Sequence, residues 1–226
     1  MKIIFAVLFA VAMVRGATAQ TGISFPTQDG GMVFADIYGS GDKAVVLAHG
    51  GQFNKESWSK QALVLVNAGY RVLAIDFRGY GNSHGPGDKD VQSAPLYQDV
   101  LAAVRYLRAG GAKWVAVVGG SMGGSAAGDA SIESKPGAID KIVMLGAAPN
   151  EPADKLHCPS LFLVAREDAS GDGTELRLPA IQRQYDRAPQ PKKLILVEGS
   201  AHAQHLFETP QSDRVMREIL DFLRGN

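Results

Sequence analysis

Short apolar runs alternate along this chain with longer stretches in which apolar residues recur every three or four positions. The short runs, rich in Val, Ile and Leu, predict buried strands, and the longer stretches predict amphipathic helices. The predicted strands cover residues 23–27, 32–38, 44–48, 71–76, 114–118, 141–145, 160–165 and 193–197. The predicted helices cover residues 55–67, 96–108, a small-residue stretch after Gly124, 175–187 and 212–223. Such alternation is typical of an α/β domain with a largely parallel sheet.

The first two predicted strands form an exception to the parallel pattern. They flank Asp29-Gly30-Gly31, a turn sequence that favours an antiparallel hairpin. Beyond this hairpin the chain has no internal repeat and no linker between domains. With 226 residues in all, it is long enough for one sizeable domain and short for two. The sequence therefore predicts one doubly wound domain over residues 20–226.

The first twenty residues have the features of a secretory signal peptide. Lys2 is followed by an uncharged apolar run over residues 3–14, and Ala17-Thr18-Ala19 is a small-x-small cleavage site. The run is shorter than the roughly 20 residues that a membrane-spanning helix needs. The alternatives are a buried first helix and an uncleaved anchor. We expect cleavage after Ala19, removal of residues 1–19, and an exported protein, periplasmic or secreted, without a stable membrane anchor.

Composition narrows the possible functions further. Lys and Arg together number 23 and Asp and Glu number 23, so the chain has no basic excess that would suit nucleic acid. The single cysteine, Cys158, excludes an internal disulfide framework and a Cys-rich zinc site. Glycine is in excess at 26 residues without a repeat, which calls for a local explanation at turns.

The segment Gly119-Gly120-Ser121-Met122-Gly123 fits the pattern G-x-S-x-G, with a predicted strand before it and a predicted helix after it. In this context the serine occupies a sharp strand-to-helix turn, and the flanking glycines let neighbouring backbone approach closely. The turn would expose the Ser121 hydroxyl at the carboxyl edge of the sheet. The alternative is a glycine-rich helix entry with a serine N-cap.

Several motifs together make the sequence resemble the α/β-hydrolase superfamily. They are His49-Gly50-Gly51, Asp76-Phe77-Arg78-Gly79-Tyr80-Gly81-Asn82-Ser83, Gly119 to Gly123, and the late residues Asp168 and His202. The resemblance implies a mostly parallel eight-stranded sheet with helices on both faces. It also implies a triad in the chain order Ser, acid, His, with no metal and no organic cofactor.

The serine needs a base within hydrogen-bond reach to remove its proton. His202 follows the last predicted strand, in the loop where the family places its base, and His205 is its rival. We expect His49 to shape the turn after the third strand, and His84 and His157 to lie on the surface or in loops, with a place at the border of the pocket as the alternative for His84.

A carboxylate must in turn orient the base. Asp168 follows the strand over residues 160–165, where the resemblance expects the acid, and Glu167 and Asp172 are its competitors. Asp76 is better explained as part of the loop architecture. The family variant with its acid after residue 145 has no carboxylate here until Glu151.

The attacked carbonyl oxygen gains negative charge, which preorganised backbone N–H groups stabilise. The candidate donors are the N–H groups of Met122, directly after the serine, and of Gly51, with Gln52 as an adjacent alternative.

The substrate is constrained mainly by chain length. Only residues 146–158 separate two predicted strands where relatives often insert a lid, so we expect no cap domain and an open, shallow site. Candidate lining residues are Phe53, Trp58, Tyr80, Met122 and Leu206. The predicted function is hydrolysis of small to medium carboxylic esters. A peptidase, a thioesterase, an acyltransferase and a non-catalytic binding protein of the same fold remain alternatives, and the oligomeric state is open.

Overall fold

A computed structural model describes residues 20–225 of the protein. The expected signal peptide, residues 1–19, lies outside the described residues. Between residues 20 and 225, no helix is both long and apolar enough to cross a membrane.

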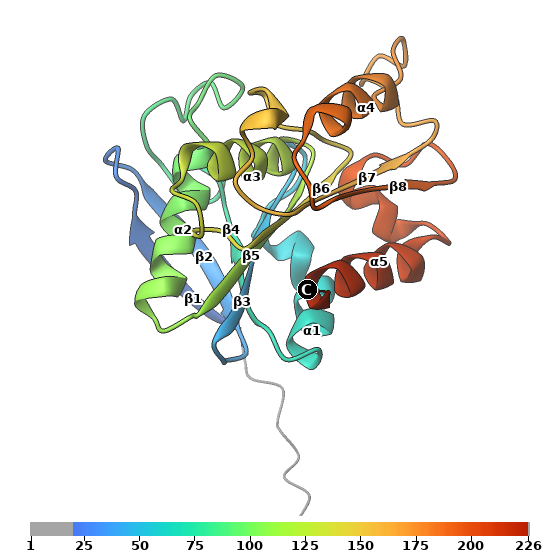
Figure 1. Ribbon diagram of the computed structural model, residues 1–226. Helices are drawn as coiled ribbons and strands as arrows, with labels where there is room; N and C mark the ends of the chain where they lie inside the picture. Colours follow the sequence, from blue (N-terminus) through green and yellow to red (C-terminus); the bar gives the residue numbers. More distant parts are fainter. Residues whose placement is uncertain (1–19, 226) are drawn as a thin grey trace, which may run out of the picture.

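Eight strands form one sheet in the order β1-β2-β4-β3-β5-β6-β7-β8 (Figure 1). They are β1 (Thr21–Pro26), β2 (Met32–Tyr38), β3 (Lys43–Ala48), β4 (Arg71–Ile75), β5 (Trp114–Gly120), β6 (Lys141–Leu145), β7 (Ser160–Ala165) and β8 (Lys192–Val197). β2 pairs antiparallel with both β1 and β4, and the remaining pairs are parallel. The predicted eight-stranded, mostly parallel sheet and its first hairpin are confirmed.

Five α-helices cover the two faces of this sheet. They are α1 (Ser59–Asn67), α2 (Tyr97–Ala109), α3 (Met122–Glu133), α4 (Leu178–Arg187) and α5 (Ser212–Arg224). Buried residues of α2, α3 and α4 join one apolar cluster, and those of α1 and α5 join the other. The sheet is therefore enclosed on both sides, as the predicted fold requires (Figure 1).

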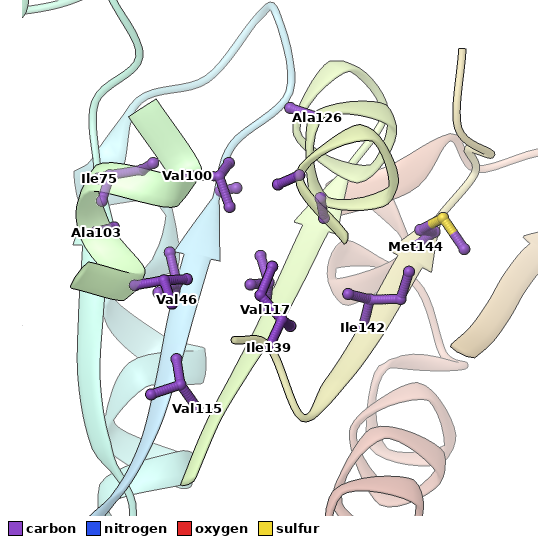
Figure 2. Close-up of a cluster of buried hydrophobic side chains, with 14 of the residues drawn as sticks. Val46, Ile75, Val100, Ala103, Val115, Val117, Ala126, Ile139, Ile142 and Met144 are labelled. Atoms are coloured by element: carbon purple, nitrogen blue, oxygen red, sulfur yellow. The ribbon is translucent and has the colours of Figure 1, made fainter. Parts of the chain in front are cut away.

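Strand residues contribute alternately to the two clusters because successive side chains point to opposite faces of a sheet. Val46 and Val117 pack beneath α2 and α3, whereas Val45 and Val118 belong to the cluster under α1 and α5. Figure 2 shows the first cluster, in which Val100 of α2 lies above these central strands. All four valines are essentially inaccessible to solvent. Burial on both faces explains why the central strands are continuous apolar runs.

Three helix starts differ from the prediction by several residues, and one of them is that of α3, which begins at Met122, before the small-residue stretch predicted after Gly124. The turn over Lys55–Trp58 is a separate 3-10 helix, η1, in which the Asn54 side chain accepts a hydrogen bond from the Ser57 N–H. The helix predicted from residue 175 begins at Leu178, with Pro179 in its first turn. Proline lacks a backbone N–H and has a fixed φ, so it suits a helix start and not an interior position.

A buried ion cluster ties the first hairpin to α2. The guanidinium of Arg78 lies 2.6 Å from Asp99 and 2.6 Å from Asp29, and Arg78 and Asp99 have almost no exposed surface. The Arg78 N–H also donates to the Asp99 carboxylate at 2.9 Å. Because each charge is paired and hydrogen-bonded, the cluster can exist in the interior.

The parallel strands end together at one edge of the sheet. Ala48 of β3 is in register with Gly119 of β5, Gly120 with Leu145 of β6, and Ala165 of β7 with Val197 of β8. The loops that follow these strands therefore emerge side by side, where open α/β sheets bind their ligands.

Candidate active site

Ser121 lies between the end of β5 and the first residue of α3 with φ +51° and ψ −120°. This left-handed φ is uncommon for a residue with a side chain. The two flanking glycines make the turn possible. A Cβ on Gly119 would lie 2.1 Å from the carbonyl oxygen of Gly123, and a Cβ on Gly123 would lie 2.3 Å from that of Ala48. The Ser121 N–H donates to the Leu145 carbonyl at 2.9 Å, which fixes the turn against β6.

His202 faces this serine from the loop after β8. Its Nε2 atom lies 2.8 Å from the Ser121 Oγ, although 81 positions separate the two residues. The His202 side chain is 27% exposed, so the pair lies at the surface of the sheet edge. A separation of 2.8 Å is within hydrogen-bond reach, which proton transfer from the hydroxyl to the imidazole requires.

Asp168 holds the other side of the imidazole ring. The His202 Nδ1 lies 3.0 and 2.9 Å from the two carboxylate oxygens of Asp168, which is fully buried. Arg177 supports Asp168 through two contacts. The Arg177 Nε lies 3.4 Å from the Asp168 Oδ1, and the Arg177 backbone N–H donates to the Asp168 backbone carbonyl at 2.8 Å. The structure thus brings Ser121, His202 and Asp168 into one hydrogen-bonded chain.

The rival residues lie elsewhere. The His205 Nδ1 contacts the Glu208 carboxylate at 2.8 Å, and its ring packs against Phe53. Glu167 is exposed, and the Asp172 carboxylate accepts hydrogen bonds from Ser170 and Thr174. These hydrogen bonds, the one from Ser170 foremost, lower the pKa of Asp172 to about 2. The His84 Nδ1 is hydrogen-bonded to the Asn82 carbonyl, and the His157 Nδ1 to the Ser134 carbonyl.

Gly146, directly after β6, is a site residue that the sequence analysis did not single out. Its φ is +58°, and a Cβ there would lie 2.9 Å from both the Asp168 Oδ2 and the His202 Nδ1. The only signal in the sequence is a glycine at the end of a buried strand, which is too common to identify it.

The two candidate oxyanion donors come from the loop after β3, which carries Gly51, and from the start of α3, which carries Met122, and both residues line the same cleft as Ser121. Met122 is the first residue of α3, so its N–H has no carbonyl partner within the helix. The peptide between Gly50 and Gly51 is held by its carbonyl, which accepts hydrogen bonds from the His49 Nδ1 at 2.8 Å and the Phe53 N–H at 3.0 Å. A trans peptide directs its N–H away from its carbonyl, so these bonds also orient the Gly51 N–H.

His49 has the structural surroundings expected for a residue that shapes this turn. Its ring is fully buried, packs edge-on against Phe77 and Tyr80, and its Nε2 accepts from the Phe77 N–H at 3.2 Å. Burial lowers the pKa of His49. A neutral ring with its proton on Nδ1 satisfies both of its hydrogen bonds.

A cleft of about 1530 Å³ opens at Ser121. Its walls are the exposed side of α3, the segment over residues 91–97, the loop over residues 146–151 and the near side of α4. Polar and charged side chains are prominent in the lining: Ser93, Ser125, Asp129, Glu133, Asn150, Arg177, Arg183 and Gln184. The segment between β6 and β7 contains only the short 3-10 helix η2 (Ala153–Lys155), so it forms no cap over the cleft.

Four of the five predicted lining residues do not contribute to this cleft. Met122 lines it, but Trp58 and Leu206 are buried in the core against α1 and α5. The Phe53 ring packs at a tilt against His205, and the Tyr80 hydroxyl donates to the Gly51 carbonyl at 2.9 Å. The prediction failed because an aromatic or apolar residue near a motif is as well suited to the core as to a pocket.

No group of three metal-binding side chains occurs in the part of the chain that the structure describes. The candidate site comprises the hydrogen-bonded chain, the two backbone donors and the cleft.

Residues 43–193 match the family model for the alpha/beta hydrolase fold. The chain belongs to the alpha/beta hydrolase family. The resemblance inferred from the sequence motifs is thereby confirmed.

Solved alpha/beta hydrolase structures share the fold of this one over nearly its whole length. An esterase from Pyrococcus furiosus superimposes with a TM-score of 0.75 at 19% identity, covering 91% of this chain and 92% of the esterase. An esterase from Exiguobacterium antarcticum has a TM-score of 0.72 at 16% identity, covering 91% of this chain and all of the other.

Curated members of the family align over shorter segments. A non-heme haloperoxidase from Rhodococcus erythropolis is 36% identical over 124 residues, which is 54% of this chain and 42% of the haloperoxidase. A 2-hydroxy-6-oxononadienedioate/2-hydroxy-6-oxononatrienedioate hydrolase from a Pseudomonas species is 33% identical over 124 residues, which is 51% of this chain and 40% of the Pseudomonas hydrolase. This chain therefore spans less than half the length of these curated relatives.

Proposed function

We propose that this protein is a serine hydrolase that cleaves small to medium carboxylic esters through an acyl-enzyme on Ser121. The observation that carries the proposal is the hydrogen-bonded chain from the Ser121 Oγ through the His202 imidazole to the buried Asp168 carboxylate. These three groups have the geometry and the order of roles of a nucleophile, a base and an orienting acid.

In the first half of the proposed reaction, the Ser121 Oγ attacks the ester carbonyl carbon while the His202 Nε2 takes the hydroxyl proton. The carbonyl π electrons move to the oxygen, and the N–H groups of Gly51 and Met122 stabilise that oxyanion. The tetrahedral intermediate then collapses, the bond to the alcohol oxygen breaks, and His202 donates its proton to the departing alcohol. Asp168 keeps the imidazole oriented and stabilises its cationic form.

In the second half, water attacks the acyl-enzyme. His202 takes a proton from the water as its oxygen bonds to the acyl carbon, and then returns a proton to the Ser121 Oγ as the carboxylic acid leaves. Neither half calls for a metal or an organic cofactor. The cleft has no cap, and its lining mixes polar side chains with apolar ones such as Leu176 and Ile181, which favours a water-soluble ester over a long acyl chain that must be shielded in an apolar tunnel.

The same acyl-enzyme would form from a thioester or an amide, as in a thioesterase or a peptidase. It could also pass its acyl group to an acceptor other than water, as in an acyltransferase, so these enzymes share the proposed catalytic residues. Because some relatives are named haloperoxidases, hydrogen peroxide is one acyl acceptor to test. It would attack the acyl carbon in place of water and release a peracid.

Turnover of 4-nitrophenyl acetate, butyrate and octanoate tests the proposal directly. We expect release of nitrophenolate that falls with the longest chain and disappears in Ser121→Ala. Amide, thioester and peroxide reactions measured beside it then rank the acceptors and leaving groups. A folded protein that hydrolyses none of the esters would overturn the proposal.

Export to the periplasm or the medium is proposed on the sequence of residues 1–19 alone. N-terminal sequencing of the exported protein should find residue 20 first.

A further inference from the structure

Gln204 is a buried polar residue of the site to which the triad assigns no role. It lies in η3 (Ala203–Glu208), is 5% exposed, and uses both ends of its amide. Its Oε1 accepts a hydrogen bond from the Gly50 N–H at 2.6 Å, across 154 positions of the chain. Its Nε2 donates to the Ser57 Oγ at 2.7 Å, and that hydroxyl donates to the Asn54 carbonyl at 2.5 Å.

The Gly50 N–H belongs to the loop that presents the candidate Gly51 donor. Three successive peptide groups of this loop are held by side chains. Gln204 accepts from the Gly50 N–H, His49 donates to the Gly50 carbonyl, and Tyr80 donates to the Gly51 carbonyl. Neighbouring peptide planes share a Cα, so a shift at Gly50 would redirect the Gly51 N–H. Glycine has no Cβ to limit such a shift, which makes the external hydrogen bonds important.

The backbone of Ala203 connects this contact to the proposed base. Ala203 has φ +49°, and with Ser121 it makes up the pair of non-glycine residues with positive φ between residues 20 and 225. Such a conformation persists only where the surroundings impose it. The conformation of Ala203 turns the chain between His202 and Gln204, so that their side chains point to different parts of the site. His202 reaches the Ser121 Oγ, and Gln204 reaches the Gly50 N–H.

The Gln204 side chain also packs against the serine turn. A Cβ on Gly120, next to Ser121, would lie 3.2 Å from the Gln204 Cγ. A Cβ on Gly50 would lie 3.4 Å from the Ser121 Cβ. Gln204 thus fills the corner where the loop after β3 meets the turn after β5.

We propose that Gln204 is a positioning residue for the oxyanion donor: its amide bridges Gly50 and Ser57, and thereby orients the Gly51 N–H toward the oxygen that becomes negative when Ser121 attacks. The proposal rests on the proposed hydrolase function. It predicts that loss of the bridge weakens binding of the transition state more than binding of the ester.

Gln204→Met tests the bridge, because methionine has a similar length and shape but neither accepts from the Gly50 N–H nor donates to Ser57. Gln204→Glu is the rescue variant, since a carboxylate still accepts from Gly50 and the Ser57 hydroxyl can turn to donate to it. Gln182→Met is the matched control. The Gln182 amide donates to Asp186 on the exposed side of α4, away from the loop after β3.

The measurement is kcat and KM for a matched pair of substrates, a 4-nitrophenyl ester and its thionoester. Sulfur is a weak hydrogen-bond acceptor, so the ratio of oxoester to thionoester turnover reports on the oxyanion donors and not on folding. We expect Gln204→Met to lower kcat for the oxoester by about 10- to 100-fold with little change in KM, and to lower the ratio by a similar factor. Gln204→Glu should restore most of the ratio, and Gln182→Met should leave it unchanged.

An unchanged ratio in Gln204→Met would overturn the proposal, whether turnover of both substrates is retained or falls by the same factor. If Gln204→Met does not fold, Ser57→Ala decides, because it removes only the far anchor of the bridge. A ratio that falls in Ser57→Ala supports the proposal, and an unchanged ratio overturns it. A wild-type protein without esterase activity would instead refute the proposed function on which this inference rests.

Discussion

The Nε2 atom of His202 lies within hydrogen-bond distance of the Ser121 Oγ, yet the two residues come from different loops at the carboxyl edge of the sheet. Ser121 is placed by the turn after β5, and His202 by the loop after β8. Because β5 to β8 are parallel and end in register, this contact depends on the sheet as a whole. The hydrogen bond is the most specific consequence of the fold for the proposed chemistry.

Separate replacement of His202 and His205 should show which of the two is the catalytic base. We expect His202→Ala to lower kcat for an ester by about four to six orders of magnitude, since an unassisted serine hydroxyl is a poor nucleophile. His205→Ala should keep activity within a few-fold, because its ring faces Glu208 and Phe53. The check is steady-state kinetics on 4-nitrophenyl acetate, and a larger loss in His205→Ala would contradict the assignment.

Gly146→Ala should impair activity without removing any polar group. The new methyl would press on the Asp168–His202 pair and would also require a left-handed φ. We expect kcat to fall by at least about 10-fold, because small displacements of positioned groups are costly in catalysis. Gly171→Ala is a suitable control, since a Cβ there meets nothing within 4 Å and its φ is not in the left-handed region. Equal kinetics in the two variants would show that the pair tolerates displacement.

Removal of the buried Arg78 should destabilise the fold strongly. Arg78→Met leaves the Asp99 carboxylate buried without its partner, which costs about 3–5 kcal/mol in comparable cases. Arg187→Met is the control, because the Arg187–Asp154 pair is more than half exposed and such solvent-screened pairs contribute little to stability. Urea unfolding curves measure both values, and a similar shift in the two variants would argue against the buried cluster as a source of stability.

The single thiol should be unreactive in the folded protein. Burial raises the pKa of Cys158 to about 11, and the thiol lies against the Ser131 hydroxyl at 3.3 Å. The reactive thiolate is therefore scarce at neutral pH and becomes abundant only as the pH approaches that value. A chromogenic disulfide reagent at pH 7.5 should label the denatured protein at once and the native protein very slowly. Rapid labelling of the native state would contradict the buried environment.

Much of the architecture was predictable because it depends on local patterns. Buried strands such as β3 and β7 are almost entirely apolar runs, and α2 ends at Ala109, directly before Gly110 and Gly111, where glycine favours a helix end. Ser121 was also accessible to prediction, because its turn requires glycines at fixed neighbouring positions.

Long-range contacts were beyond such patterns. Nothing in the sequence pairs Gln204 with Gly50, because neither a periodicity nor a motif links residues 154 positions apart. The same is true of Arg177, which reaches Asp168 only after the loop between β7 and α4 has folded back. The burial of Trp58 and Leu206 likewise depends on the packing of α5, which their neighbours in sequence do not reveal.

The central claim is that Ser121 is a nucleophile activated by His202. Labelling with a fluorophosphonate probe tests it most directly, because the probe phosphonylates only an activated serine and requires no knowledge of the natural substrate. We expect one adduct per chain, located on Ser121 by peptide mass spectrometry, no adduct in Ser121→Ala, and labelling slowed at least about 1,000-fold in His202→Ala. A folded wild-type protein that remains unlabelled, or an adduct on another residue, would contradict the account.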